Sequence, residues 1–162
     1  ERQALEIADW GDNVYVKIPI TNTRQQSASG LIQRLSSQGV RLNITAILAL
    51  DQVQEVATAV QNGPACIVSV FAGRIADTGV DPIPVMKDAL AILQSAPNAE
   101  LLWASPREVL NIYQADAIGC DIITATNDLL QKLALAGKDL AEYSLETVRM
   151  FYNDAQKAGY EL

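Results

Sequence analysis

The sequence predicts an α/β fold in which parallel strands alternate with helices along the chain. Five short segments rich in β-branched residues are each followed by apolar residues at the i, i+3, i+4, i+7 spacing of an amphipathic helix. Successive strands begin about 20 to 35 residues apart, which leaves room for a helix that crosses back over the sheet. We find no linker or low-complexity segment, and we expect residues 1–162 to form a single domain.

The elements are predicted in order from these patterns. The strands are 14–20, 41–48, 65–72, 100–105 and 120–126. The first three helices are indicated by the stripes Ala28/Leu31/Ile32/Leu35, Val53/Val56/Ala57/Val60 and Met86/Ala89/Leu90/Leu93. Later helices are indicated by Val109/Ile112/Tyr113, Leu130/Leu133/Ala134 and Val148/Phe151/Tyr152/Ala155.

Local signals predict where several helices begin and end. Asp51 with Gln54, and Ser105-Pro106 with Glu108, have the residue types of capping-box starts. The segment 74–84 contains prolines and a Thr-Gly pair, and is predicted to be a long loop. Glycines lie where helices should stop, at Gly39, Gly63, Gly119 and Gly137.

The first predicted strand places one lysine, Lys17, among apolar and β-branched residues. Both alternating faces of 14–20 are mainly apolar, which is typical of a strand covered on both sides in a parallel sheet. We therefore expect Lys17 to have little access to water. Burial disfavours the charged ammonium form, and a neutral amine is a nucleophile for a carbonyl carbon. The strand alone also allows a lysine that reaches out to solvent from a strand end.

Polar residues on the same side of the strands as Lys17 are a second indication of a functional site inside the sheet. Polar groups collected inside a parallel β structure, near the carboxyl ends of its strands, are typical of the active-site end of a (β/α) barrel. Taken one at a time, each hydroxyl could equally bond to the backbone. The inner positions are Asn43, Thr45, Ser69, Ser105 and Thr124, and the positions expected to face helices include Ile44, Ala46, Val68, Val70 and Ala104.

Composition limits the chemistry. The chain has no histidine, which excludes a His-based zinc site and any Ser-His or Cys-His nucleophile. Its two cysteines, Cys66 and Cys120, are isolated, so we expect no metal and core packing in a reducing cytoplasm. A net charge of −7 argues against a nucleic-acid partner. No apolar run is long enough to span a membrane, and we expect no membrane partner.

Five segments, in order, resemble motifs of the transaldolase family. They are 16–21 (VKIPIT), 39–46 (GVRLNITA), 69–77 (SVFAGRIAD), 104–107 (ASPR) and 119–124 (GCDIIT). The resemblance implies an α/β fold of the (β/α)8 or TIM-barrel type, with a class I aldolase mechanism. It further implies a Schiff base between Lys17 and a ketose phosphate, with no metal and no cofactor. The expected substrates are sugar phosphates of the pentose phosphate pathway.

The resemblance assigns roles to the individual residues that stand at the positions of the family's functional residues. Lys17 would attack the C2 carbonyl of the sugar, and Thr45 would help to hold the catalytic water. Asn43 and Ser69 would contact the dihydroxyacetone part of the substrate.

The same resemblance implies a phosphate site at Arg74, Ser105 and Arg107, with help from donors at a helix N-terminus. Considered without the resemblance, both arginines would be read as surface charge. Phe71 is also expected to contact substrate, at a position where the fructose-6-phosphate aldolase branch has a proton-transferring tyrosine. A phenylalanine there favours a transaldolase, which transfers a dihydroxyacetone unit. A fructose-6-phosphate aldolase is the alternative.

The extent of the chain is the largest departure from the family. Residues 1–13 look like the end of a third helix, so we expect only five of the eight βα units. Three N-terminal units, with the family's acid–base residues, are expected to be missing. An open five-stranded sheet has unpaired edges, so we expect homo-oligomers or association with a separate N-terminal segment. In this chain by itself, the inner face with Lys17 is expected to be open to water. The chain alone is expected to be inactive, which leaves a non-catalytic barrel fragment as a further alternative.

Overall fold

Five strands form one parallel sheet in the computed structural model, which describes residues 1–160. The strands are β1 (Val16–Pro19), β2 (Leu42–Ile47), β3 (Cys66–Val70), β4 (Ala99–Trp103) and β5 (Ile122–Ile123), and their order in space is their order in the chain. Each neighbouring pair is parallel. The predicted α/β fold is therefore confirmed, and parallel strands that lie in chain order are the arrangement found in part of a (β/α) barrel.

Every strand ends earlier than the sequence pattern predicts. The largest difference is in β5, where only Ile122 and Ile123 pair with β4 in place of the predicted 120–126. Hydrophobicity marks residues that are buried, whereas a strand also needs a neighbour to pair with. An edge strand has one neighbour only, so its ends leave the ladder first.

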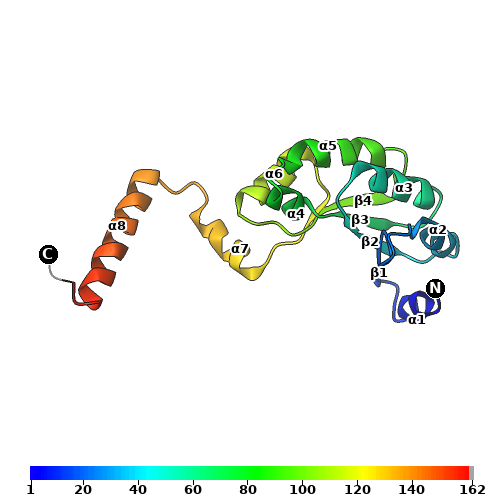
Figure 1. Cartoon of the computed structure of the whole chain (residues 1–162), viewed down its shortest axis with the longest axis horizontal. Coiled ribbons are helices and arrows are strands. Elements are labelled where there is room, and N and C mark those ends of the chain that lie inside the picture. The colour runs from blue at the N-terminus through cyan, green and yellow to red at the C-terminus, as the bar shows by residue number, and fades with distance from the viewer. Residues whose placement is uncertain (161–162) are drawn as a thin grey trace. The chain divides into compact units, whose positions relative to one another are not determined.

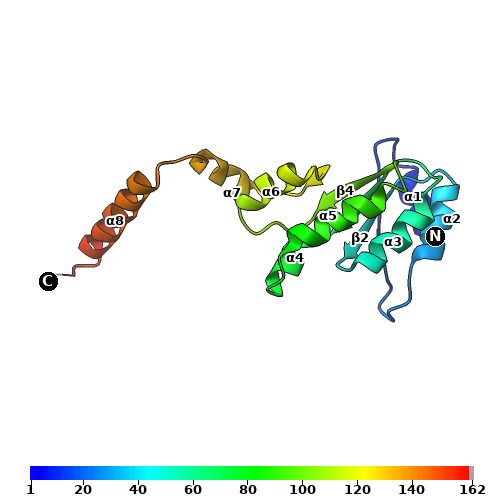
Figure 2. The same ribbon diagram turned by 90° about the horizontal axis from the view of Figure 1, so that it is seen from above.

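The helices alternate with the strands as expected. In order they are α1 (Arg2–Ala8), α2 (Ser29–Ser37), α3 (Leu50–Val60), α4 (Ala72–Asp77), α5 (Pro82–Leu93), α6 (Leu110–Ile118), α7 (Asn127–Lys132) and α8 (Leu140–Lys157), with a 3₁₀ turn, η1 (Leu133–Leu135), before α8. Figure 1 shows α3 and α5 along one face of the sheet, and Figure 2 shows the same two helices side by side.

The prediction of a long loop over 74–84 is wrong. Most of this segment is helical, since α4 ends at Asp77 and α5 begins at Pro82. The start of α5 has a local cause: Asp81 accepts a hydrogen bond of 3.0 Å from the backbone N–H of Ile83, and proline suits the first helical position.

Both predicted capping boxes are also wrong. The side chain of Gln52, not of Asp51 or Gln54, closes the start of α3, because it accepts hydrogen bonds from the backbone N–H groups of Leu48 and Ala49 at 2.9 and 3.1 Å. The helix after β4 begins at Leu110, so Ser105, Pro106 and Glu108 precede it. Two predicted glycine stops are confirmed, because Gly39 and Gly119 follow α2 and α6 with φ of +82° and +76°.

The core lies between the sheet and the helices that cover one of its faces. Apolar side chains from alternate strand positions pack there against the predicted helical stripes. The fully buried side chains include Leu42, Ile44, Ile47, Val68, Val70, Leu101 and Trp103 from the strands, and Ile32, Leu35, Val56, Val60 and Met86 from the helices.

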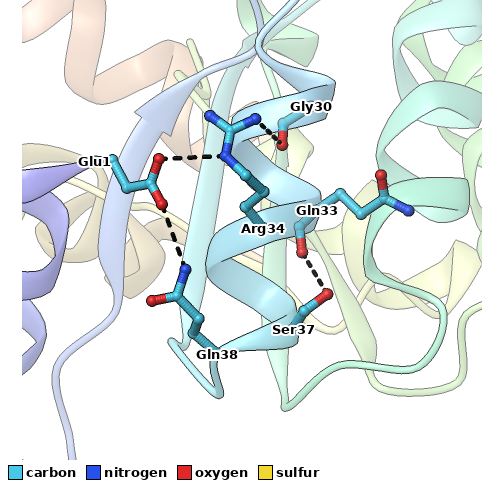
Figure 3. Close-up of polar contacts among 6 residues, drawn as sticks. All are labelled: Glu1, Gly30, Gln33, Arg34, Ser37 and Gln38. Carbon is cyan, nitrogen blue, oxygen red and sulfur yellow. Dashed lines mark hydrogen bonds and ion pairs between the residues drawn. The ribbon is translucent and has the colours of Figure 1, made fainter.

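The N-terminal residues are joined to α2 by a small polar network (Figure 3). The carboxylate of Glu1 accepts hydrogen bonds from Arg34 Nε at 3.2 Å and from Gln38 Nε2 at 3.4 Å. Arg34 also donates to the backbone carbonyl of Gly30 at 3.0 Å. The hydrogen bond from Arg34 lowers the pKa of the Glu1 carboxyl. The network links the first residue of the chain to a helix that covers the sheet.

The described residues separate into two compact units, of which the second begins at Asn127. Within that unit, Asp139 caps α8 by accepting a hydrogen bond of 2.9 Å from the backbone N–H of Glu142. The apolar stripe of α8 is helical as predicted, but its large side chains are exposed; Phe151, for example, is 62% exposed. Among residues 1–160, no helix is both long enough and apolar enough to cross a membrane.

Burial of Cys66 on β3 generates the first prediction. Burial raises the pKa of the Cys66 thiol from 9.0 to about 12, with a smaller contribution from the nearby charge of Glu100. The unfolded thiol therefore ionises first as pH rises, and the free energy of unfolding should fall between about pH 9 and pH 12. Urea titrations across this range should show a shallower fall for Cys66→Ala. An identical pH dependence in both proteins would contradict this.

Candidate active site

The register of the sheet places the predicted inner residues on one face. Lys17 is the partner of Asn43 across β1 and β2, and Pro19 is the partner of Thr45. Partners in adjacent parallel strands point to the same side of the sheet. Ser69 on β3 joins this group, because its hydroxyl donates a hydrogen bond of 2.7 Å to Asn43 Oδ1. Three neighbouring strands thus contribute one polar cluster.

Lys17 itself is exposed, which confirms the expectation that the inner face of the open sheet is accessible to water in this chain. The burial that the strand pattern alone indicates is not formed. In β1 the burial alternates: Val16 and Ile18 are buried on the side of the helices, whereas Lys17 and Pro19 are exposed on the opposite side. The apolar residues on both faces indicate a doubly covered strand, but within residues 1–126 helices cover only one face of the sheet.

Thr45, unlike Lys17, is buried. It is only 7% exposed, and its hydroxyl oxygen has no hydrogen-bond partner among residues 1–160. The strand is irregular here, because the pairing of β2 with β3 shifts between Ile44 and Ile47. Ala46 lies within the irregular stretch with φ of +61° and is exposed, so the prediction that it faces the helices is wrong. The bulge leaves Thr45 on the side of Lys17, with a buried hydroxyl that can still accept and donate.

A second group of candidate residues lies in the segments that follow β3 and β4. These segments touch at Gly73, whose backbone N–H donates to the carbonyl of Ala104 at 3.2 Å. A Cβ added at Gly73 would lie only 1.5 Å from the carbonyl oxygen of Ser105. Glycine is therefore required for the two segments to come so close.

Ser105 is not where the parity of the strand places it. β4 ends at Trp103, and Ser105 has φ of +57°, which takes it out of the strand alternation. Ala104 continues the parity of Leu102, on the side opposite the helices, so its predicted orientation is also wrong. Since α6 begins only at Leu110, the expected phosphate donors at a helix N-terminus next to Ser105 are not formed.

Both candidate arginines make contacts within the molecule. The guanidinium of Arg74 on α4 lies 5.4 Å from the centre of the Phe71 ring, a cation–π distance. Arg107 is paired with Asp77, the last residue of α4, through its Nε at 3.0 Å from Asp77 Oδ1 and through a second contact to Oδ2.

Three residues that support this region were not singled out by the sequence. They are Gly73 and Asp77 on α4, and Asn111 on α6, whose Oδ1 accepts from the backbone N–H of Arg107 at 2.7 Å. Gly73 and Asp77 stand inside the segment 69–77 that resembles the family motif, which was the available signal. Asn111 has no comparable signal, because its role depends on how α6 folds back.

No group of three or more His, Cys, Asp or Glu side chains suited to a metal ion is present among residues 1–160. The two groups of candidate residues contain one amine, hydroxyls, an amide and two guanidiniums, one of which is paired with a carboxylate. Such a set can form a covalent imine with a carbonyl compound and can bind an anionic group.

Comparison with known proteins gives a consistent result. A profile of the family described as "Transaldolase/Fructose-6-phosphate aldolase" matches residues 1–162. Among similar proteins are those named "Probable transaldolase" from Dehalococcoides mccartyi, 36% identical over 135 residues, and from Nitrosopumilus maritimus, 32% identical over 133 residues. A third, from a Thermoanaerobacter species, is 29% identical over 164 residues.

The matches cover most of this chain and a smaller part of each relative. They include 82% and 81% of the chain for the first two relatives, and 99% for the third. The same alignments cover 58%, 56% and 69% of the relatives. The chain thus spans little more than half the length of the first two.

The close approach at Gly73 generates the second prediction. Gly73→Ala should lower the free energy of unfolding by about 1–3 kcal/mol, because the new methyl group collides with backbone that must move. Gly30→Ala in α2 is the matched control, since its Cβ would meet nothing closer than 3.7 Å and alanine favours a helix. Urea denaturation of both variants checks this. Equal stability of Gly73→Ala and the parent would show that the two segments are not tightly joined.

Proposed function

The chain belongs to the transaldolase/fructose-6-phosphate aldolase family, and from this premise we propose that it carries the Schiff-base lysine of a transaldolase. The reaction would transfer a dihydroxyacetone unit from a ketose phosphate to an aldose phosphate. The observation that carries the proposal is the polar cluster on one face of the sheet, where Lys17 lies beside Asn43 and Asn43 is bonded to Ser69.

The proposed chemistry follows from these groups. The neutral amine of Lys17 attacks the C2 carbonyl, water leaves, and a protonated imine forms. A base, expected in the family's N-terminal units, takes the proton of the C4 hydroxyl. The imine accepts the electron pair when the C3–C4 bond breaks, and the aldose phosphate departs with its new C4 carbonyl. The resulting enamine then attacks the carbonyl of an acceptor, and hydrolysis restores the lysine. Thr45 is suited to hold the water of these steps, because its hydroxyl is buried and has no protein partner among residues 1–160.

The phosphate group of the substrate is proposed to lie near the joined segments after β3 and β4. Arg74, Ser105 and Arg107 come from these two segments, which the contact at Gly73 holds together. Guanidinium groups bind phosphate through charge-assisted, often bidentate, hydrogen bonds. This site would favour phosphorylated sugars in a chain whose net charge is −7.

Transfer is preferred over simple cleavage because of Phe71. Its ring is half-buried and stacks with Arg74, and a phenyl ring has no proton to exchange with the enamine. A fructose-6-phosphate aldolase, which releases free dihydroxyacetone, is the alternative. A non-catalytic fragment that acts by assembly is favoured by one observation, the exposure of Lys17 on the uncovered face of the sheet.

Partners and location form part of the same proposal. The substrates are sugar phosphates of the pentose phosphate pathway, and the reaction takes place in the cytoplasm without metal or cofactor. The free thiols of Cys66 and Cys120 are compatible with a reducing compartment. Further chain, from another copy or from a separate N-terminal segment, would cover the exposed side of Lys17 and exclude water from it.

The third prediction tests the covalent intermediate. Borohydride reduction in the presence of fructose 6-phosphate should add the mass of a sugar-derived group to the peptide that contains Lys17. The preparation should carry the full length of the family's barrel. Lys17→Met should abolish the adduct, whereas Lys87→Met, an exposed lysine on α5, should leave it unchanged. Peptide mass spectrometry locates the adduct, and labelling at another lysine would refute the assignment.

The fourth prediction separates transfer from cleavage. In the same preparation, transfer to erythrose 4-phosphate should be much faster than release of free dihydroxyacetone. Phe71→Tyr should shift the ratio toward release, because a phenol can protonate the enamine. Enzymatic assays of both products provide the ratio. Free release of dihydroxyacetone by the parent protein would favour the aldolase alternative.

A further inference from the structure

Asp77 is the acidic residue that contacts the candidate phosphate site most directly. It ends α4, one turn after Arg74, and its carboxylate faces Arg107 from the segment after β4. Two parallel contacts join the pair: Arg107 Nε to Oδ1 at 3.0 Å and Arg107 Nη2 to Oδ2. This is the bidentate geometry in which a carboxylate fixes the plane of a guanidinium.

The backbone around Arg107 is fixed independently of this pair. Asn111 on α6 accepts hydrogen bonds from the backbone N–H groups of Arg107 and Glu108 at 2.7 and 3.1 Å. On the other side, Gly73 packs against the carbonyl of Ser105. The side chain of Arg107 thus starts from a fixed backbone and ends on a fixed carboxylate, so little of its conformational freedom remains.

Stability is a poor explanation for the pair. The side chains of Arg107 and Asp77 are 48% and 51% exposed, and ion pairs at such exposure contribute little to folding. Orientation is a better one. Asp77 occupies the edge of the guanidinium formed by Nε and Nη2, which leaves the edge formed by Nη1 and Nη2 for another anion.

We propose that Asp77 is a positioning residue, which holds the Arg107 guanidinium in the orientation that binds the phosphate of the sugar substrate. The inference rests on the proposed function, since it assumes that Arg107 contacts phosphate. Holding the side chain in place removes part of the entropy cost that phosphate binding would otherwise carry. The negative charge of Asp77 opposes an incoming phosphate, and the gain in order outweighs this repulsion.

The test measures the dissociation constant of inorganic phosphate for the 162-residue chain by NMR titration. Asp77→Ala should weaken binding by about three- to tenfold, although it removes a negative charge. Asp88→Ala on α5 is the matched control; it removes the same charge at an exposed position and should change binding by less than about twofold. The Arg107 Nε–H signal should exchange faster with water in Asp77→Ala, and the urea midpoint should stay close to that of the parent.

Arg107→Ala tests the proposed phosphate site separately from the positioning role of Asp77. Arg107→Ala should weaken phosphate binding by roughly ten- to a hundredfold. Adding Asp77→Ala should cause no further loss of affinity, because the two residues act through one contact. If Arg107→Ala weakens phosphate binding while Asp77→Ala leaves the affinity unchanged or increases it, the positioning role is wrong and the proposed function stands. If Arg107→Ala has no effect, or the parent chain does not bind phosphate, the proposed phosphate site fails and the role of Asp77 with it.

Discussion

Packing of one face of the sheet against α2, α3 and α5 is the interaction on which the remaining structure depends. Ile44, Val68 and Leu101, from the three central strands, are completely buried on that face. Because side chains alternate along a strand, this burial also decides which residues lie on the opposite face. A shift of one residue in β2 would bury Asn43 among apolar helices and expose Ile44. The polar cluster around Lys17 is therefore held in place by the core behind it.

The polar cluster departs from the rules that govern the core. Its three strands carry an exposed amine, an amide bonded to a hydroxyl, and at Thr45 a buried hydroxyl without a protein partner among residues 1–160. A buried polar group that lacks a hydrogen bond costs free energy, so it is retained only where something else is gained. Departures of this kind are expected at functional sites, and this one coincides with the positions that the family resemblance selects.

A different kind of constraint organises the proposed phosphate site. The segments that follow β3 and β4 contact each other at two places. One is the backbone contact at Gly73, and the other is the ion pair between Asp77 and Arg107. Parallel sheets bring such segments to one edge, which is why sites gather at the carboxyl ends of their strands. Because Gly73 has no Cβ atom, the two segments can approach each other closely.

The sequence by itself determined the alternation of strands and helices, the stripes of the covering helices and the set of candidate residues, because periodicity and residue type are local properties. It also placed Lys17 and Asn43 on one side of the sheet, as the register shows. The pattern of the first strand alone did not show that Lys17 is exposed, although the expected absence of three βα units did. Nor could the sequence show that Ala46 lies in a bulge or that Ser105 leaves the strand alternation. Those outcomes depend on which face the helices cover and on how β2 pairs with β3. The roles of Asp77 and Asn111 likewise required tertiary structure, because hydrogen bonds between separate segments exist only once the chain has folded.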